Sequence, residues 1–227
     1  MIPVVIAPST GGTGYGDAGT RSLVARPSAL LGRVVSLRGT MPHAAHRQVI
    51  LQRLDARRGW RAVARGRVRT SEHFLVSWRT DRSGTVRLRA VLAPRAAHAR
   101  RRGRDRAAAA STGHRAPAAA APVVDVTVYR PAMASFYGPG FFGRQTACGV
   151  TLMPETTGVA HRRLPCGTLV QIMYRGREII VPVIDRGPFS NRYSWDLTQA
   201  TADALGFQGG GGIGYMRAPA ALAPAPA

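Results

Sequence analysis

The chain has 227 residues, 45% of them hydrophobic, and 32 basic against 11 acidic residues give it a formal net charge of +21. This length suffices for one large or two small domains, and no run of 18 apolar residues is present, which argues against a transmembrane helix. All the basic residues are arginine, and neither a zinc-finger spacing nor an aromatic RNA-binding pattern accompanies them, so we expect no nucleic-acid partner.

Residues 1–28 are rich in Gly, Ser, Thr and Pro, which predicts a disordered amino-terminal segment. The apolar run 1–7 is too short for a secretory leader and lacks a basic flank. For an exported protein, we therefore expect either that the true start lies upstream or that the leader has been removed.

Residues 29–95 are predicted to form a small β-sandwich that resembles the immunoglobulin-like modules of exported bacterial proteins. Short alternating runs are separated by turn signals at 57–59 and 81–84. The arginines alternate with apolar residues, so they form either a solvated face or a surface for an anionic polymer. The predicted strands are residues 33–38, 48–53, 60–64, 73–78 and 85–91.

Residues 96–122 form an Arg/Ala/Pro-rich segment, interpreted as an extended linker. A second domain is predicted over 123–218, with a strand at 124–128, a hairpin of 167–174 with 177–184, and a last strand at 215–217. Its one helix is predicted at 197–205, with Asp196 as N-cap and Gly206 as the stop. Residues 209–214 are expected to be a flexible turn, and the tail 219–227 to be disordered.

The chain has two cysteines, Cys148 and Cys166. Their spacing fits neither a CxxC redox motif nor a four-ligand zinc site. They are either free thiols or a disulfide, and the glycines that follow them, Gly149 and Gly167, favour the disulfide. A disulfide would indicate an oxidising compartment outside the cytosol. We predict neither a metal site nor a cofactor.

Five short motifs carry a family resemblance across about 75 residues. In this order and spacing they resemble the rare lipoprotein A (RlpA) family, which implies a six-stranded double-psi β-barrel with one short helix. The cysteine pair resembles an actinobacterial-type variant of that family, which supports the disulfide and export. The motifs are Ala-Ser-Phe-Tyr-Gly at 134–138, Gly-Arg-Gln-Thr-Ala at 143–147, Ala-His-Arg-Arg-Leu-Pro-Cys-Gly-Thr at 160–168, Asp-Arg-Gly-Pro-Phe at 185–189 and Asp-Leu at 196–197.

The resemblance implies lytic transglycosylation of peptidoglycan, in which the MurNAc–GlcNAc bond is cut without water and a 1,6-anhydro end is left. One carboxylic acid protonates the leaving oxygen and then accepts the proton of the sugar's own C6 hydroxyl. We therefore expect an extracellular or cell-wall monomer that binds glycan strands. The arginine-rich amino-terminal half is a candidate contact for anionic wall polymers.

Three residues are the catalytic candidates. Asp185 follows an apolar strand, where burial would raise its pKa as a general acid requires; alternatively it caps its own turn. His161 orients Asp185 or holds the glycan; alternatively it is a histidine at the core edge. Asp196 matches a site that is catalytic or contacts glycan in related barrels, although capping alone would explain an aspartate there.

The candidate substrate-binding residues are Tyr137, Thr146 and Arg186. Tyr137, like Phe136, would stack on a sugar ring or instead pack within the barrel. Thr146 would donate a hydrogen bond, and Arg186 would pair with a carboxylate of a wall peptide or of Asp196. One position departs from the family: catalytic members carry Glu where this chain has Val150. Glu155 lies five residues further on. The alternative function is therefore a non-catalytic, expansin-like module that binds or loosens the wall.

Overall fold

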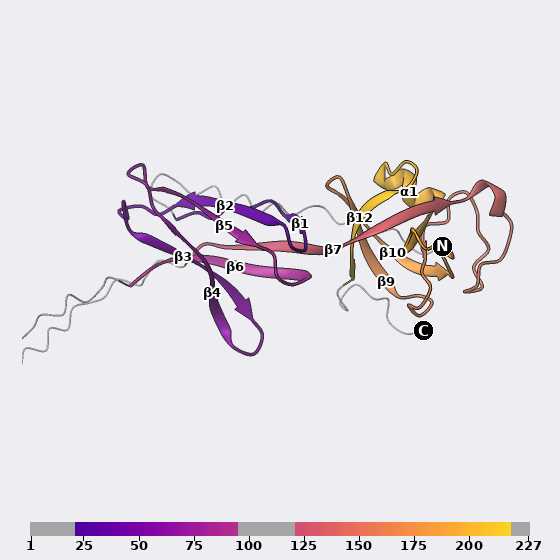
Figure 1. The fold of residues 1–227 in the computed structure, drawn as a ribbon, viewed down its shortest axis with the longest axis horizontal. Coiled ribbons are helices and arrows are strands. Elements are labelled where there is room, and N and C mark those ends of the chain that lie inside the picture. The colour runs from indigo at the N-terminus through magenta and orange to yellow at the C-terminus, as the bar shows by residue number, and fades with distance from the viewer. Residues whose placement is uncertain (1–20, 95–120, 219–227) are drawn as a thin grey trace, which may run out of the picture.

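The computed structural model of the chain describes residues 21–94 and 121–218, and nearly all of its regular structure is β-strand (Figure 1). This confirms the mainly-β class predicted from sequence. Among the described residues, no helix is long and apolar enough to cross a membrane. The amino-terminal strands are β1 (Ser28–Leu30), β2 (Val34–Thr40), β3 (Gln48–Asp55), β4 (Gly59–Arg67), β5 (His73–Arg79) and β6 (Gly84–Leu92).

The amino-terminal part consists of two sheets around one apolar core. Strands β2 and β5 pair with each other, and β4, β3, β6 and the first half of the next strand form the other sheet. Every second side chain of β2 and β5 is buried, as the alternation predicts for strands with one face on a core. All five strands predicted for this segment form, while its assignment as an immunoglobulin-like sandwich stays a prediction.

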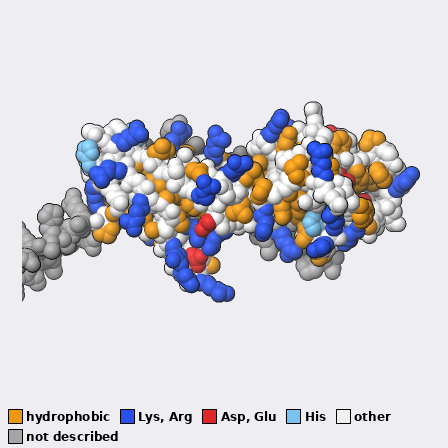
Figure 2. Space-filling model, in the orientation of Figure 1, with side chains coloured by type: hydrophobic (Ala, Val, Ile, Leu, Met, Phe, Trp, Pro, Cys, Tyr) orange, Lys and Arg blue, Asp and Glu red, His pale blue; other side chains and the backbone are white. Residues whose placement is uncertain are grey.

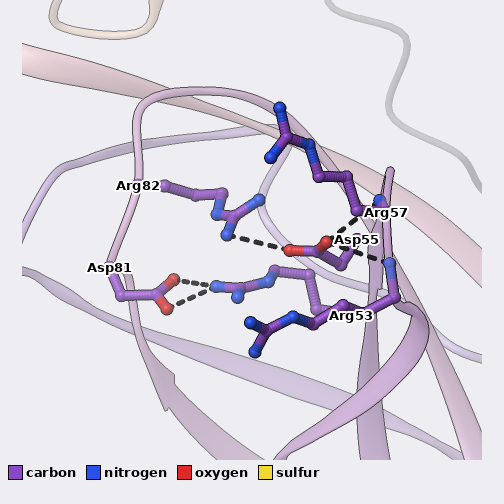
Figure 3. A network of polar contacts seen from close by, with 6 residues as sticks. Arg53, Asp55, Arg57, Asp81 and Arg82 are labelled. Atoms are coloured by element: carbon purple, nitrogen blue, oxygen red, sulfur yellow. Dashed lines mark hydrogen bonds and ion pairs between the residues drawn. The ribbon is translucent and has the colours of Figure 1, made fainter.

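Ion pairs fix the turn between β5 and β6 against the end of β3 (Figure 3). The guanidinium of Arg53 contacts both carboxylate oxygens of Asp81, and its side chain is only 9% exposed. Nη2 of Arg82 donates to Oδ2 of Asp55 at 3.1 Å. The same carboxylate accepts the backbone N–H of Arg57, the main cause of the lowered pKa of Asp55. The turn that follows β5 is therefore held from two sides.

Residues 21–28 depart from the disorder expected for 1–28. Leu23 is 4% exposed and belongs to the amino-terminal core, and Val24 forms an antiparallel bridge with Arg38. Strand β1 then pairs in parallel with the strand that contains Thr127. A composition averaged over 28 residues hides these few apolar anchors. Residues 1–20, most of the predicted linker (95–120) and the tail 219–227 lie outside the described residues.

Strand β7 (Val123–Tyr137) belongs to both parts of the molecule. Its first half pairs with β6 in antiparallel register, from Arg89↔Val123 to Gly84↔Val128. Its second half pairs with strands of the carboxy-terminal part. The two parts therefore meet within this strand, near Tyr129, and not in the predicted linker, which instead connects two neighbouring strands of one sheet.

The carboxy-terminal part is a closed six-stranded barrel. The strand order is β11-β8-β10-β9-β12-β7, and pairing of β11 with β7 closes it. Two of the pairings, β11 with β7 and β10 with β8, are parallel. The predicted hairpin forms as β9 and β10. The remaining elements are η1 (Pro139–Phe141), β8 (Val159–Ala160), β9 (Leu169–Tyr174), β10 (Arg177–Asp185), β11 (Trp195–Thr198), α1 (Gln199–Leu205) and β12 (Gly211–Arg217).

The last strand begins earlier than predicted. Residues 211–214, expected to lie in a flexible turn, are part of β12 and pair with β7. A side chain at Gly214 would place its Cβ 2.7 Å from Cβ of Tyr129. Glycine there lets the two strands approach closely, and this reason for a glycine cannot be read from local sequence.

Candidate functional site

Asp185 ends β10, and backbone groups hold its carboxylate. Its Oδ1 accepts the N–H of Ala147 at 2.9 Å and the N–H of Arg186 at 2.8 Å. Its backbone carbonyl accepts the N–H of His161 at 3.1 Å. The geometry is that of the turn-capping alternative, with a second donor from a distant loop, and it fixes the carboxylate in one orientation.

Asp196 lies within β11, paired in register with Ser135 of β7. The prediction that it is a helix N-cap is wrong: Thr198 caps α1 and accepts the N–H of Thr201 through its side chain. The strand pairing continues through Thr198, so the helix starts two residues later than expected. Capping therefore does not account for an aspartate at 196.

Asp196 is half-buried, and its Oδ1 is buried without a hydrogen-bond partner among the described residues. Burial raises its pKa to about 6, the charge of Asp185 adds to this rise, and a hydrogen bond with Ser135 opposes it. A carboxyl with this pKa is partly protonated near neutral pH and can donate a proton.

Tyr137 completes the group at the end of β7. Its hydroxyl is buried without a hydrogen-bond partner of ordinary geometry among the described residues. Burial is the main cause of its raised pKa, and the charges of Asp185 and Asp196 raise it further. We call Tyr137, Asp185 and Asp196 the acidic cluster. These three candidates lie within electrostatic reach of one another.

His161 has different neighbours. Its Nδ1 accepts the N–H groups of Arg163 at 3.1 Å and Leu164 at 3.0 Å, so the neutral ring carries its proton on Nε2. Burial lowers its pKa, and the charges of Arg186 and the two arginines that follow His161 lower it further. Neither aspartate of the acidic cluster contributes to this shift. His161 thus contacts Asp185 through the backbone while its ring lies in a cationic and aromatic environment.

Arg186 contacts the segment that follows His161. Its Nη1 donates to the carbonyls of His161 at 3.3 Å and Leu164 at 3.0 Å, and its Nη2 lies 3.2 Å from Sγ of Cys166. Among the described residues it forms no ion pair, so the predicted pairing with Asp196 is absent. The guanidinium positions a loop, and its role toward substrate stays a prediction.

The predicted disulfide between Cys148 and Cys166 is present, with a Cα–Cα distance of 5.7 Å. It joins the segment that follows His161, which Arg186 contacts, to the turn that begins at Thr146. In that turn, Oγ1 of Thr146 accepts the N–H of Val150 at 3.2 Å, and the N–H of Thr146 donates to the carbonyl of Val150 at 2.8 Å. This turn positions the backbone N–H of Ala147 to donate to Oδ1 of Asp185.

Glu155 does not take the place of the carboxylate expected where Val150 stands. Glu155 is exposed, and it is not among the charges that shift the pKa of Tyr137 or Asp196. The described residues hold no group of three or more potential metal ligands.

The sequence analysis missed one residue beside the site. Phe189, four positions after Asp185, is 85% exposed. A large aromatic side chain so open to solvent next to catalytic candidates fits stacking on a sugar ring. The available signal was an aromatic residue directly after a Gly-Pro turn, but sequence alone does not tell whether such a ring faces solvent.

Comparison with known proteins places the barrel in context. Residues 131–217 match the family described as lytic transglycolase. The "Probable endolytic peptidoglycan transglycosylase RlpA" of Aquifex aeolicus is 44% identical over 75 residues, which are 32% of this chain and 33% of that protein. The protein of the same name from Synechocystis sp. is 41% identical over 81 residues, 35% of this chain and 25% of that protein.

The "Endolytic peptidoglycan transglycosylase RlpA" of Campylobacter jejuni is 36% identical over 85 residues, 37% of this chain and 31% of that protein. The chain thus spans between a quarter and a third of the length of these relatives. Among solved structures, the Streptomyces papain inhibitor is 27% identical and covers 38% of this chain, with a TM-score of 0.31.

Proposed function

Residues 131–217 belong to the RlpA-like double-psi β-barrel family, and on this premise we propose that the chain is an exported lytic transglycosylase that cleaves peptidoglycan glycan strands. The observation that carries the proposal is the Asp196 carboxyl beside Asp185, with its Oδ1 buried and without a hydrogen-bond partner among the described residues and its pKa raised to about 6, mainly by burial. Lytic transglycosylation requires a proton donor at the glycosidic oxygen, and a second, fixed carboxylate beside it can stabilise the positive charge that develops on the sugar.

In the proposed reaction, Asp196 takes the role that the sequence analysis gave to Asp185. Protonated Asp196 donates to the glycosidic oxygen as the C1–O bond of the muramyl residue breaks. The C6 hydroxyl of the same sugar then forms the new C1–O bond, and its proton returns to Asp196. Asp185, held by two backbone N–H groups, places its carboxylate close to the positive charge that develops on the sugar. Its charge adds to the burial that raises the pKa of Asp196.

The other candidate residues take no part in the proton transfer; they position the site or contact the substrate. His161 supplies a backbone N–H to Asp185 and an imidazole for substrate contact. Arg186 and Thr146 hold the two loops that meet at the disulfide. Tyr137 and Phe189 offer aromatic rings to sugars. The disulfide fits an oxidising compartment outside the cytosol, as a wall enzyme requires.

The second candidate is a non-catalytic module that binds or loosens the wall, and Val150 is the observation that favours it. The two functions separate in one experiment. Purified protein is incubated with whole sacculi, and released muropeptides are analysed by mass spectrometry. Anhydro-muropeptides from the wild type but not from Asp196→Asn support catalysis. Sedimentation with sacculi without any such release supports binding alone.

The arginine-rich amino-terminal part is proposed to contact anionic wall polymers. Figure 2 shows basic side chains spread over this part, with few acidic ones among them. On β4, Arg61, Arg65 and Arg67 lie along a strand that pairs with β3 alone in the hydrogen-bond ladders. None of the three forms an ion pair with another described residue. Retention of the protein by sacculi that falls as salt screens the charges would support this contact.

A further inference from the structure

A pocket of about 500 Å³ opens where the barrel meets the turn between β5 and β6. Its floor includes Val170 and Trp195, two buried residues of the barrel core. Its wall includes His161 and Tyr215. The pocket is thus the mouth of the barrel at the end that faces the amino-terminal part, a place where β-barrels commonly bind ligands.

Strand register places two arginines at this mouth. Arg130 of β7 pairs with Tyr215 of β12, and directly opposite residues share a face of a sheet. Arg217 lies two residues beyond Tyr215 on β12, so its side chain is on that face too. Both arginines are exposed, line the pocket and form no ion pair among the described residues. No acidic residue lines the pocket.

Three aromatic rings lie in contact at the pocket; Trp195 is buried in the barrel core, and His161 and Tyr215 are partly exposed. The ring centroids of His161 and Trp195 lie 4.5 Å apart, and those of Trp195 and Tyr215 lie 5.0 Å apart. The Nε2–H of His161 makes no hydrogen bond within the described residues and is available to a ligand. Aromatic faces, one N–H donor and two guanidinium groups fit a ring that carries a carboxylate.

The amino-terminal part completes the rim through Ser83 and Gly84. These residues directly follow Asp81 and Arg82, whose ion pairs to β3 are drawn in Figure 3. The antiparallel pairing of Gly84 with Val128 attaches the same turn to β7. The rim is therefore positioned by fixed structure, and it lies outside the residues matched by the family, which begin at 131.

We propose that this pocket is a subsite for a carboxylate-bearing segment of the peptidoglycan strand, with Arg130 and Arg217 as its carboxylate ligands. The inference rests on the proposed function for its choice of polymer. The carboxylate has two sources in that polymer, the lactyl group of N-acetylmuramic acid where no peptide is attached and the peptide where one is, and both present the same chemistry to the arginines.

The test is a binding measurement by titration calorimetry on the full chain in an Asp196→Asn background, which prevents consumption of ligand. Three soluble glycans of equal length are the probes: a muramyl oligomer without peptide, the same oligomer with peptide, and an N-acetylglucosamine oligomer without any carboxylate. The variants are Arg130→Gln, Arg217→Gln and the double change. Arg192→Gln, an exposed barrel arginine outside the pocket, is the matched control.

Each Gln change is expected to weaken binding of the muramyl ligands about ten-fold, with binding of the neutral oligomer and of the control variant unchanged. In the peptide-bearing oligomer the lactyl carboxyl is bound as an amide, so an effect confined to the peptide-free ligand assigns the lactyl carboxylate, and one confined to the peptide-bearing ligand assigns the peptide. An effect on both shows that the arginines accept either carboxylate. Arg130→Lys with Arg217→Lys keeps the charge and should restore part of the affinity. This pair also serves as the folded reference if the double Gln variant unfolds.

Unchanged affinity in the double Gln variant, or an equal loss for the neutral oligomer, would overturn the subsite. The result is independent of catalysis, because cleavage of sacculi is measured on the wild type. A protein that cleaves nothing yet shows the arginine dependence retains the subsite and loses the enzymatic proposal. A protein that cleaves sacculi but shows no arginine dependence retains the enzymatic proposal and loses the subsite.

Discussion

At the scale of single residues, the surroundings of the carboxyl groups separate the two aspartates that the sequence offers as catalytic candidates. Both follow or lie within apolar strands, and both match family motifs. Only the three-dimensional structure shows that backbone N–H groups hold Asp185 while Oδ1 of Asp196 is buried without a hydrogen-bond partner among the described residues. Sequence could name both residues, but it could not decide which of them retains a proton, because burial depends on packing across β7 and β11.

Asp196 should give the protein a pH-dependent stability. Its folded pKa of about 6 lies above the ordinary value of 3.8, so the folded state binds the proton more tightly. The stabilisation is fully present below about pH 4 and is lost as pH rises through about 6. The loss should be on the order of 2 kcal/mol. Urea unfolding at pH 4 and pH 8 should show it in the wild type and not in Asp196→Asn.

The exposed acid Glu155 provides the control for this measurement, since Glu155→Gln removes a carboxylate that has no contact with the cluster. It should leave the pH dependence of the wild type intact. An Asp196→Asn variant that retains the full pH dependence would mean that another group titrates in this range.

The proton donor should also set the pH profile of cleavage. If Asp196 must be protonated, activity should fall about ten-fold per pH unit well above pH 6. The rate of anhydro-muropeptide release from sacculi, measured between pH 5 and 8, checks this. A rate that rises steadily over that range would assign the donor role to a different group.

Phe189 is expected to contact glycan without contributing to the fold. At 85% exposure, its ring packs little against the barrel, so Phe189→Ala should leave the melting temperature nearly unchanged. Loss of one stacking contact should weaken retention by sacculi several-fold. Phe141→Ala, which removes a ring packed edge-on at 6.0 Å from Tyr137, provides a comparison. Equal retention of wild type and Phe189→Ala would remove the ring from the binding surface.

At the scale of elements, local sequence patterns predicted the strands that bury one face and expose the other. The five amino-terminal strands and the β9–β10 hairpin could be predicted because alternation and turn residues encode them locally. The start of α1 could not, because pairing of Leu197 and Thr198 with β7 overrides their helical spacing. The barrel itself could be predicted only from its resemblance, since its parallel pairings join residues distant in sequence.

The disulfide links two loops that both contact Asp185 or its neighbours. Closing a loop of 18 residues is worth about 3 kcal/mol in the entropic model. Reduction should therefore lower the free energy of unfolding by about that amount, and Cys148→Ser with Cys166→Ser should show the same loss without reductant. Chemical denaturation of both forms measures it. Reductant should not change the stability of the double Ser variant.

At the scale of the whole molecule, strand β7 determines where the chain can be divided. A barrel fragment that begins at residue 123 keeps Val124, Val126 and Val128, which β6 and the amino-terminal core bury in the intact protein. An unpaired strand with exposed apolar residues promotes self-association. A fragment that begins at residue 130 should run as a monomer in size-exclusion chromatography, while the longer one should associate. Monomeric behaviour of both would contradict this role for β7.

The connection between β6 and β7 has a further consequence for proteolysis. Its two ends belong to neighbouring strands of one ladder, so a single cut anywhere in residues 95–120 severs the chain without separating its halves. The two fragments would remain associated through the six residue pairs between β6 and β7 and the shared core. The two fragments would co-elute in chromatography under native conditions and would separate only in denaturant. The protein would then behave as a heterodimer assembled from one gene product.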